Sequence, residues 1–225
     1  ISIALFIKES RQRDQGATYR PSRWAATGEA VRHPVIGRLM LLTFMVGFAF
    51  TGIESVFGLW TQARFGWEPR DVAFAFMIVG IASSITQLGL TARLSERFGQ
   101  GVMLAVGMFI TMVCIGLQPF STGGPMTIAL MTLSAIGQSV AWPNVSALIS
   151  ETADPHRQGQ IMGLNNAAGA LARVIGPYCA GLSFESISVN GPYFQGAIVV
   201  APAIFLALSA GRRAAAWRAA NPNVV

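Results

Sequence analysis

The sequence predicts an all-α integral membrane protein with six transmembrane helices. Hydrophobic residues make up 52% of the 225 positions and charged residues only 12%, about half the charged share of an ordinary soluble domain. The apolar residues gather in six stretches, each close to the roughly 20 residues needed to cross a hydrocarbon core. Short breaks rich in Gly, Pro and Asn separate the stretches, and no alternating pattern typical of β-strands competes with helices.

The six apolar stretches define the expected helices. They cover Val35–Trp60, Val72–Leu94, Val102–Leu117, Pro125–Ile149, Gln160–Phe184 and Phe194–Ala210. Turn-forming segments fall between them: Gly66–Pro69, Gly99–Gly101, Gly123–Pro125, Asp154–His156 and Asn190–Pro192. Because these connections are short, neighbouring helices are expected to run antiparallel.

Three regions follow from this pattern. Residues 1–33 combine an apolar start with a polar, basic linker that is expected to lie on a membrane face. The start, Ile1–Ile7, is interpreted as the end of a preceding helix, because seven residues cannot span a bilayer. Residues 34–211 form the six-helix bundle, and residues 212–225 form a C-terminal tail.

The basic residues predict an orientation. Lys and Arg number 16 against 10 Asp and Glu, and they sit in short clusters rather than in one dense patch, which disfavours nucleic acid and favours anionic lipid headgroups. Basic residues near span ends favour the cytoplasm. With a cytoplasmic linker, only Arg64 and Arg70 face the outside and Arg173 lies within a span. Both termini are then cytoplasmic.

Aromatic residues and cysteines receive structural interpretations. Trp60, Phe65 and Trp67 cluster at the outer end of the first stretch, where amphipathic rings anchor helices at the headgroup level. Cys114 and Cys179 lie inside apolar stretches and are expected to behave as small buried hydrophobic residues. No disulfide framework or metal-binding spacing is present.

The turn between the second and third stretches carries a family motif. It reads Ala92-Arg93-Leu94-Ser95-Glu96-Arg97-Phe98-Gly99-Gln100-Gly101 and resembles the Gly-x-Leu-Ala-Asp-Arg-x-Gly-Arg-Arg signature of major facilitator transporters. Glu96 replaces the Asp, Ala92 replaces the first Gly, and the closing basic pair is absent. The segments KES at 8–10 and QGQIMGLNNAAGALARVIGPYCAG at 158–181 are similar to the sixth and eleventh helices of drug:proton antiporters.

The resemblance implies that the chain is the C-terminal six-helix half of a twelve-helix transporter, closest to the tetracycline-exporter-like branch. In that family two halves surround a central cavity that opens to each side of the membrane in turn. The first and fourth helices of a half line the cavity, and the second and fifth pack on the other half. The implied function is proton-coupled export of a small amphipathic or hydrophobic compound.

Four polar or aromatic residues are the candidates for a cavity wall. Glu54 is either a substrate-contacting or proton-accepting carboxylate at the cavity mouth, or a carboxylate that reaches the outer headgroups. Gln138 and Trp142 stand four apart on one helix face, and Asn144 follows Pro143, whose ring frees a backbone carbonyl. The alternative for these three is hydrogen bonding and packing between helices.

A second group is expected at the interface with the other half or in coupling. Gln87, Asn165 and Asn166 are amides at membrane depth, for which structural hydrogen bonding is favoured. Arg173 is too deep to reach the cytoplasmic surface easily; it either binds loosened backbone carbonyls or Glu54, or contacts substrate. The same stretch presents a ridge of small residues expected to pack against another helix, Ala168, Ala172, Gly176 and Ala180.

The motif turn has two compatible interpretations. Arg93, Glu96 and Arg97 either anchor the cytoplasmic surface or form an ion-pair latch between helix ends that breaks as the cavity changes access.

No enzymatic motif for hydrolysis, nucleotide binding or metal binding occurs, so neither an enzyme nor a cofactor is expected. The expected partners are the bilayer, a small-molecule substrate, and a missing N-terminal six-helix half or another membrane subunit. Two alternatives to export stay open: a half-length, transport-inactive subunit of a larger membrane complex, and a dimer of two halves held by the small-residue ridge.

Overall fold

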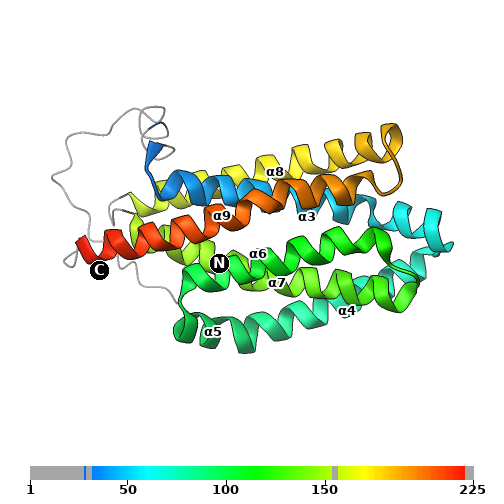
Figure 1. The fold of residues 1–225 in the computed structure, drawn as a ribbon, viewed down its shortest axis with the longest axis horizontal. Coiled ribbons are helices and arrows are strands. Elements are labelled where there is room, and N and C mark those ends of the chain that lie inside the picture. Colours follow the sequence, from blue (N-terminus) through cyan, green and yellow to red (C-terminus); the bar gives the residue numbers. More distant parts are fainter. Residues whose placement is uncertain (1–27, 29–31, 154–156, 221–225) are drawn as a thin grey trace, which may run out of the picture.

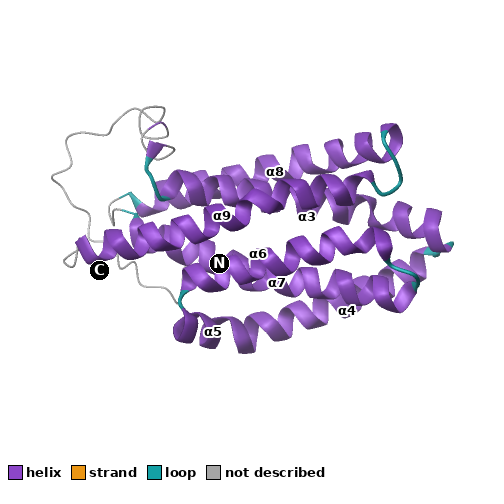
Figure 2. Ribbon diagram, viewed as in Figure 1, coloured by secondary structure: helices purple, strands orange, loops and turns teal. Residues whose placement is uncertain are grey.

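In the computed structural model the chain is a bundle of long helices. The structure describes residues 28, 32–153 and 157–220, and within these residues there is no strand (Figure 2). The elements are α3 (Ile36–Phe65), α4 (Pro69–Ile85), η1 (Thr86–Leu90), α5 (Thr91–Phe98), α6 (Gln100–Leu117), η2 (Gln118–Phe120), α7 (Gly124–Thr152), α8 (Gln158–Ser186) and α9 (Gly191–Ala220). Because α4, η1 and α5 are continuous, the described residues form six helical rods lying side by side (Figure 1).

Four rods are long and apolar enough to cross a membrane by themselves: Ile36–Phe65, Pro69–Phe98, Gln100–Phe120 and Gly191–Ala214. α7 and α8 are as long, but internal Gln, Asn and Arg residues lower their hydropathy. α7 packs along α6 and α8 packs along α3, so both lie at the same membrane depth as their neighbours. The predicted all-α membrane fold is confirmed.

The predicted helix boundaries lie within four residues of the observed ones at most ends, and two helices are clearly longer than predicted. The first helix continues past Trp60 to Phe65, and the last continues past Ala210 to Ala220. The apolar pattern ends earlier in both cases because polar residues enter the final turns, where they are still good helix formers. The predicted turn at 154–156, most of the linker assigned to 1–33, and residues 221–225 lie outside the described residues.

The turn between α3 and α4 shows how local sequence sets the boundaries. Gly66 ends α3 in the left-handed conformation at φ 68°, which glycine adopts without the steric penalty of a Cβ atom. Pro69 then occupies the first turn of α4, where a missing N–H is harmless. The Asp71 carboxylate accepts a hydrogen bond from the Glu68 backbone N–H at 2.9 Å, completing a reciprocal cap.

A single π-helical turn, η1, interrupts the second rod. Thr86 and Thr91 are five residues apart, yet both are buried. The Thr86 hydroxyl donates to the Ala82 carbonyl at 2.8 Å, and the Thr91 hydroxyl donates to the Thr86 carbonyl at 3.0 Å. The wider turn therefore places residues i and i+5 on one face of the rod.

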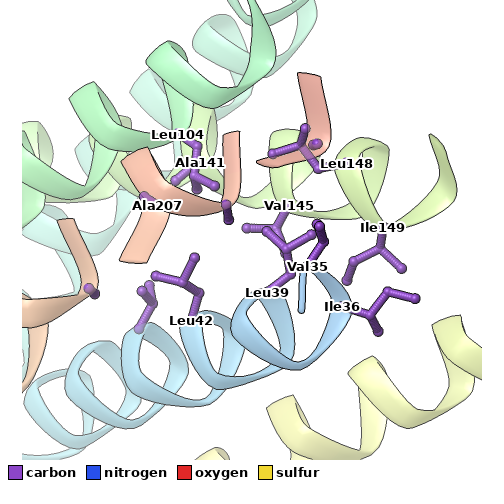
Figure 3. Packing of buried hydrophobic residues seen from close by; sticks show 14 of the residues in the cluster. Val35, Ile36, Leu39, Leu42, Leu104, Ala141, Val145, Leu148, Ile149 and Ala207 are labelled. Carbon is purple, nitrogen blue, oxygen red and sulfur yellow. The ribbon is translucent and has the colours of Figure 1, made fainter. Parts of the chain in front are cut away.

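The rods pack in an order that leaves α9 between α3 and α6. α3 packs mainly on α8 and α9, α6 packs mainly on α7 and α9, and α4 packs on α7. The largest apolar core joins α3, α6, α7 and α9 and includes Leu39, Leu42, Leu104, Val145 and Leu148 (Figure 3).

Small residues allow α3 and α8 to approach closely. A Cβ atom at Gly47 would lie 3.1 Å from the Cβ of Ala172, and one at Gly52 would lie 3.0 Å from the Gly176 carbonyl oxygen and 3.2 Å from the Cβ of Ala180. The predicted small-residue ridge of α8 is therefore a packing surface for α3. Because α3 covers it, the ridge is not available to a second copy, and this route to a dimer was a wrong prediction.

α6 and α7 are held together even more tightly. A Cβ atom at Gly107 would lie 2.4 Å from the Gly137 carbonyl oxygen, and one at Gly137 would lie 2.6 Å from the Gly107 carbonyl oxygen. The Thr111 hydroxyl donates to the carbonyls of Gly107 and Ser134 at 2.9 and 3.2 Å. Only glycine fits at these two positions with the backbones at this distance.

The Phe65 end of α3 corrects one prediction. Trp60 is fully buried against Tyr193, with ring centroids 4.8 Å apart, and its indole N–H donates to the Asn190 side-chain oxygen at 2.8 Å. It therefore packs inside the bundle and is not a headgroup anchor. The Arg64 guanidinium lies 5.6 Å from the Trp60 ring and donates to Asn190 and to the Ser121 carbonyl, both at 3.4 Å.

Candidate functional site

The structure brings Trp142 of α7 and Arg173 of α8 together beside Gly169. A Cβ atom at Gly169 would lie 3.5 Å from Cη2 of Trp142, 3.7 Å from Nη2 of Arg173 and 3.5 Å from Cγ2 of Thr43. The indole and the guanidinium therefore both lie within van der Waals contact of the position that a Gly169 side chain would occupy. We call this place the Gly169 notch.

A buried hydrogen bond lies at the base of the notch. The Thr43 hydroxyl donates to the side-chain oxygen of Asn165 at 2.7 Å, and both residues are 2% exposed. Asn165 therefore joins α8 to α3 through its side chain. Thr43 was missed by the sequence reasoning, because a threonine within an apolar stretch has no signal that separates it from packing residues.

Arg173 has no counter-charge in the described part of the chain. Its side chain is exposed, and its Nε donates to the Gly169 carbonyl at 3.4 Å, a long hydrogen bond. No carboxylate of the described residues forms an ion pair with it, so the predicted alternative of an Arg173–Glu54 pair is wrong for this structure. Pro177 lies one turn further along the same helix.

Glu54 lies further along the bundle than Arg173. Gly47 packs beside Ala172, the residue before Arg173, whereas Gly52 packs beside Gly176 and Ala180. Glu54 is seven residues after Gly47, or about 10 Å along the helix at 1.5 Å per residue. The Glu54 side chain is exposed. The other acidic residues described within helices lie near helix ends, so Glu54 is the carboxylate at membrane depth in the described part of the chain.

The structure corrects the placement of Asn144. It is 2% exposed, and its Nδ2 donates to the Val140 carbonyl of its own helix at 2.7 Å. Its amide thus bonds to a backbone carbonyl one turn earlier in α7, so in this conformation Asn144 faces the interior of the bundle and not a cavity wall. Gln138, one turn before Trp142, is half-buried.

The remaining predicted interface amides are accessible. Gln87 in η1 is exposed and its Nε2 lies 3.5 Å from the Ser139 hydroxyl of α7, a long contact between rods. Asn166 is exposed on α8 beside the buried Asn165. Their predicted roles toward another half stay predictions.

The motif turn does not form an ion-pair latch within the described residues. Arg93, Glu96 and Arg97 are all exposed on α5, and the Arg97 guanidinium lies 5.6 Å from the Phe98 ring. A hydrogen bond joins the start of α6 to the end of α7 instead: Nε2 of Gln100 donates to the Glu151 carboxylate at 2.6 Å.

A separate cleft of about 400 Å³ opens at the other end of the bundle, between α4 and α7. Its lining residues are Trp67, Asp71, Phe74, Ile78, Gly124, Pro125 and Ile128. Its one carboxylate, Asp71, is engaged in the cap of α4. The cleft contains none of the predicted site residues.

The chain matches known proteins over most of its length. A family model described as Major Facilitator Superfamily matches residues 12–223. "Multidrug resistance protein 2" of Bacillus subtilis (strain 168) is 25% identical over 170 residues, which cover 75% of this chain and 42% of that protein. "Tetracycline resistance protein, class C" of Escherichia coli is 26% identical over 191 residues, which cover 83% of this chain and 46% of that protein.

A third relative also matches most of this chain with less than half of its own length. "Quinolone resistance protein NorA" of Staphylococcus aureus (strain Mu50 / ATCC 700699) is 23% identical over 156 residues, 69% of this chain and 40% of that protein. The chain thus spans less than half the length of each of these relatives. The family match, the six-rod bundle and the motif turn agree, and the chain belongs to the major facilitator superfamily, a family of integral membrane transporters.

Proposed function

We propose that this chain forms the C-terminal half of a secondary transporter that exports a small amphipathic or hydrophobic compound in exchange for protons. The observation that carries the proposal is the Gly169 notch, where an aromatic and a cationic side chain meet at membrane depth. Drug-resistance relatives support the substrate class. They give no support to the alternative of a transport-inactive subunit.

The proposed setting is a bacterial plasma membrane, with both termini in the cytoplasm. Arg64 and Arg70 lie at the end of the bundle that contains the α3–α4 turn. The opposite end contains Arg93, Arg97, Arg157, Arg212 and Arg213. Basic residues gather on the cytoplasmic side of membrane proteins, which supports a cytoplasmic location for the second end.

The proposed partner is a second six-helix half, within the same polypeptide or in another subunit. We place that half against the side where Glu54 of α3 and Arg173 of α8 are exposed and Trp142 of α7 is half-buried. Charged groups at membrane depth are stable where they face protein or a water-filled cavity. Alternating access then arises from rocking of the two halves around this face.

Glu54 is the proposed proton carrier. Glu54 is exposed at membrane depth, and ionisable side chains there commonly mark proton pathways. Protonation from the outer side and release toward the cytoplasm would then exchange protons for substrate during each cycle.

Replacing Glu54 with glutamine should abolish the coupling of substrate export to proton movement, while the side chain keeps its shape. We expect efflux driven by an imposed pH gradient to fall at least tenfold in proteoliposomes that contain the complete gene product, on the scale of a lost acid–base group. Exchange of labelled for unlabelled substrate, which moves no net proton, should continue. Glu185→Gln, at the exposed end of α8, is the matched control, and normal gradient-driven efflux by Glu54→Gln would refute the assignment.

A further inference from the structure

The cleft between α4 and α7 has a charged end and an apolar interior. Asp71 stands in the first turn of α4, whereas Ile78 and Ile128 line the cleft further along the two helices. Asp71 and Ile78 are seven residues apart, or about 10 Å at 1.5 Å per residue. Because the apolar span Pro69–Phe98 begins at the same turn, the cleft runs from headgroup level into the hydrocarbon.

Trp67 forms a fixed wall at the charged end of the cleft. Its ring lies edge-on to the Phe57 ring of α3, with centroids 6.2 Å apart. On the other side, a Cβ atom at Gly124 of α7 would lie 3.2 Å from Cζ2 of Trp67. The half-buried indole is therefore held between α3 and α7. The volume of the cleft, about 400 Å³, is within the range of ligand sites in proteins.

An exposed apolar strip on α4 continues the cleft. Phe74 is 54% exposed within the cleft, and Ile81 and Ile85 beyond it are 55% and 62% exposed. Side chains three or four residues apart share one helix face, and this spacing separates Phe74, Ile78, Ile81 and Ile85. The strip from Phe74 to Ile85 is about 16 Å long, about the depth of one bilayer leaflet. A hydrocarbon chain fits this length, whereas a compact ligand would use the cleft alone.

Two opposite charges stand at the start of α4. The Asp71 carboxylate lines the cleft and accepts the Glu68 backbone N–H through Oδ2, so its second oxygen can accept from another donor. No Lys or Arg of the described residues forms an ion pair with Asp71. Arg70 is exposed and lies one turn before Phe74, on the same helix face. A carboxylate next to a guanidinium complements a headgroup that carries both an ammonium and a phosphate.

We propose that this cleft binds a phospholipid with an ethanolamine headgroup. The ammonium lies on Asp71, the phosphate on Arg70, and one acyl chain follows Phe74 and Ile78 along α4. A primary ammonium has three N–H donors for the carboxylate, whereas a choline headgroup carries the same charge without a donor. A guanidinium is well suited to a phosphate. The lipid site goes beyond the proposed export function and does not depend on it.

The test compares two lipids that differ only in the methyl groups of the headgroup nitrogen. Dioleoyl phosphatidylethanolamine and dioleoyl phosphatidylcholine have the same chains, phosphate and net charge. Each is added at equal concentration to the complete gene product in detergent, and bound lipid is counted by native mass spectrometry. We expect the ethanolamine lipid to be retained about threefold more than the choline lipid, the size that an exposed charge-assisted contact supports.

Variants assign each contact. Asp71→Asn keeps an oxygen that can cap α4 and removes the charge, so the preference for the ethanolamine lipid should disappear. Arg70→Gln should reduce retention of both lipids by the same factor, because both carry the phosphate. Ile78→Trp fills the cleft and should also reduce both. Glu185→Gln is the matched control: it removes an exposed carboxylate in the last turn of α8, at the same end of the bundle, and should change neither.

Three results would overturn the inference. Equal retention of the two lipids by the unmodified protein would show that no carboxylate recognises the ammonium, and this comparison stands even if Asp71→Asn does not fold. A preference that survives in Asp71→Asn would place the headgroup elsewhere. Unchanged retention of both lipids by Ile78→Trp would mean that the second six-helix half, and not a lipid, covers the cleft.

Discussion

Replacing Gly137 with leucine is expected to prevent stable assembly of the bundle, and Gly137→Ala is expected to destabilise it by about 1–3 kcal/mol, the usual range for overpacking. A new Cβ atom would lie 2.6 Å from a backbone oxygen of α6 and 2.7 Å from the Thr111 hydroxyl. That backbone oxygen can move only if α6 moves, and α6 also packs on α9.

Thermal unfolding of the purified protein in detergent micelles measures the effect of the Gly137 variants. Gly80→Ala and Gly80→Leu are the matched controls, because Gly80 is also helical and a Cβ atom there has no neighbour within 4 Å. Stability of Gly137→Leu equal to that of Gly80→Leu would show that α6 and α7 are not held at the distance described here.

Replacing Trp60 with alanine should destabilise the protein by about 3–5 kcal/mol, the range for removal of a large buried aromatic side chain. The indole is fully buried against Tyr193 and Phe65, so its removal leaves a cavity. Trp60→Phe keeps most of the ring contact and loses the hydrogen bond to Asn190; it should cost about 1–2 kcal/mol.

The same unfolding measurement applies to Trp60. Phe205→Ala removes an aromatic ring from α9 that is 76% exposed, and it should leave the unfolding temperature nearly unchanged. If Trp60 were a headgroup anchor, Trp60→Ala would leave the unfolding temperature in detergent micelles unchanged and would lower stability only in a bilayer.

The length and order of the helices could be predicted from the sequence because hydrophobicity and turn chemistry act locally. Gly66, Pro69 and Gly99 each mark a helix end that the structure contains. The π-helical turn at Thr86–Leu90 could not be predicted in this way. It depends on the packing of Thr86 and Thr91 against neighbouring rods, and the local sequence carries no distinct signal for it.

The faces of the helices that point into the bundle are harder to predict from the sequence than the helix ends. Lipid tails are as apolar as leucine, so a membrane helix can be hydrophobic on all sides, and its buried face has no hydrophobic signature. Trp60 was therefore placed at the headgroups and Asn144 at a cavity wall, although both are buried in the bundle. For Arg173 the charge itself predicts a position that faces protein or water and not lipid.

The π-helical turn η1 (Thr86–Leu90) lets the second rod lose one residue with little effect on its packing. Removing one residue from an ordinary α-helix rotates everything beyond it by about 100°, which turns much of its buried face outward. Deleting Gly89, inside the wide turn, would instead convert the turn to regular α-helix and keep Thr86 and the former Thr91 on one side. Deleting Gly80 has no such compensation. The second rod thus contains a position, Gly89, where one residue can be lost without rotating the part of the helix beyond it.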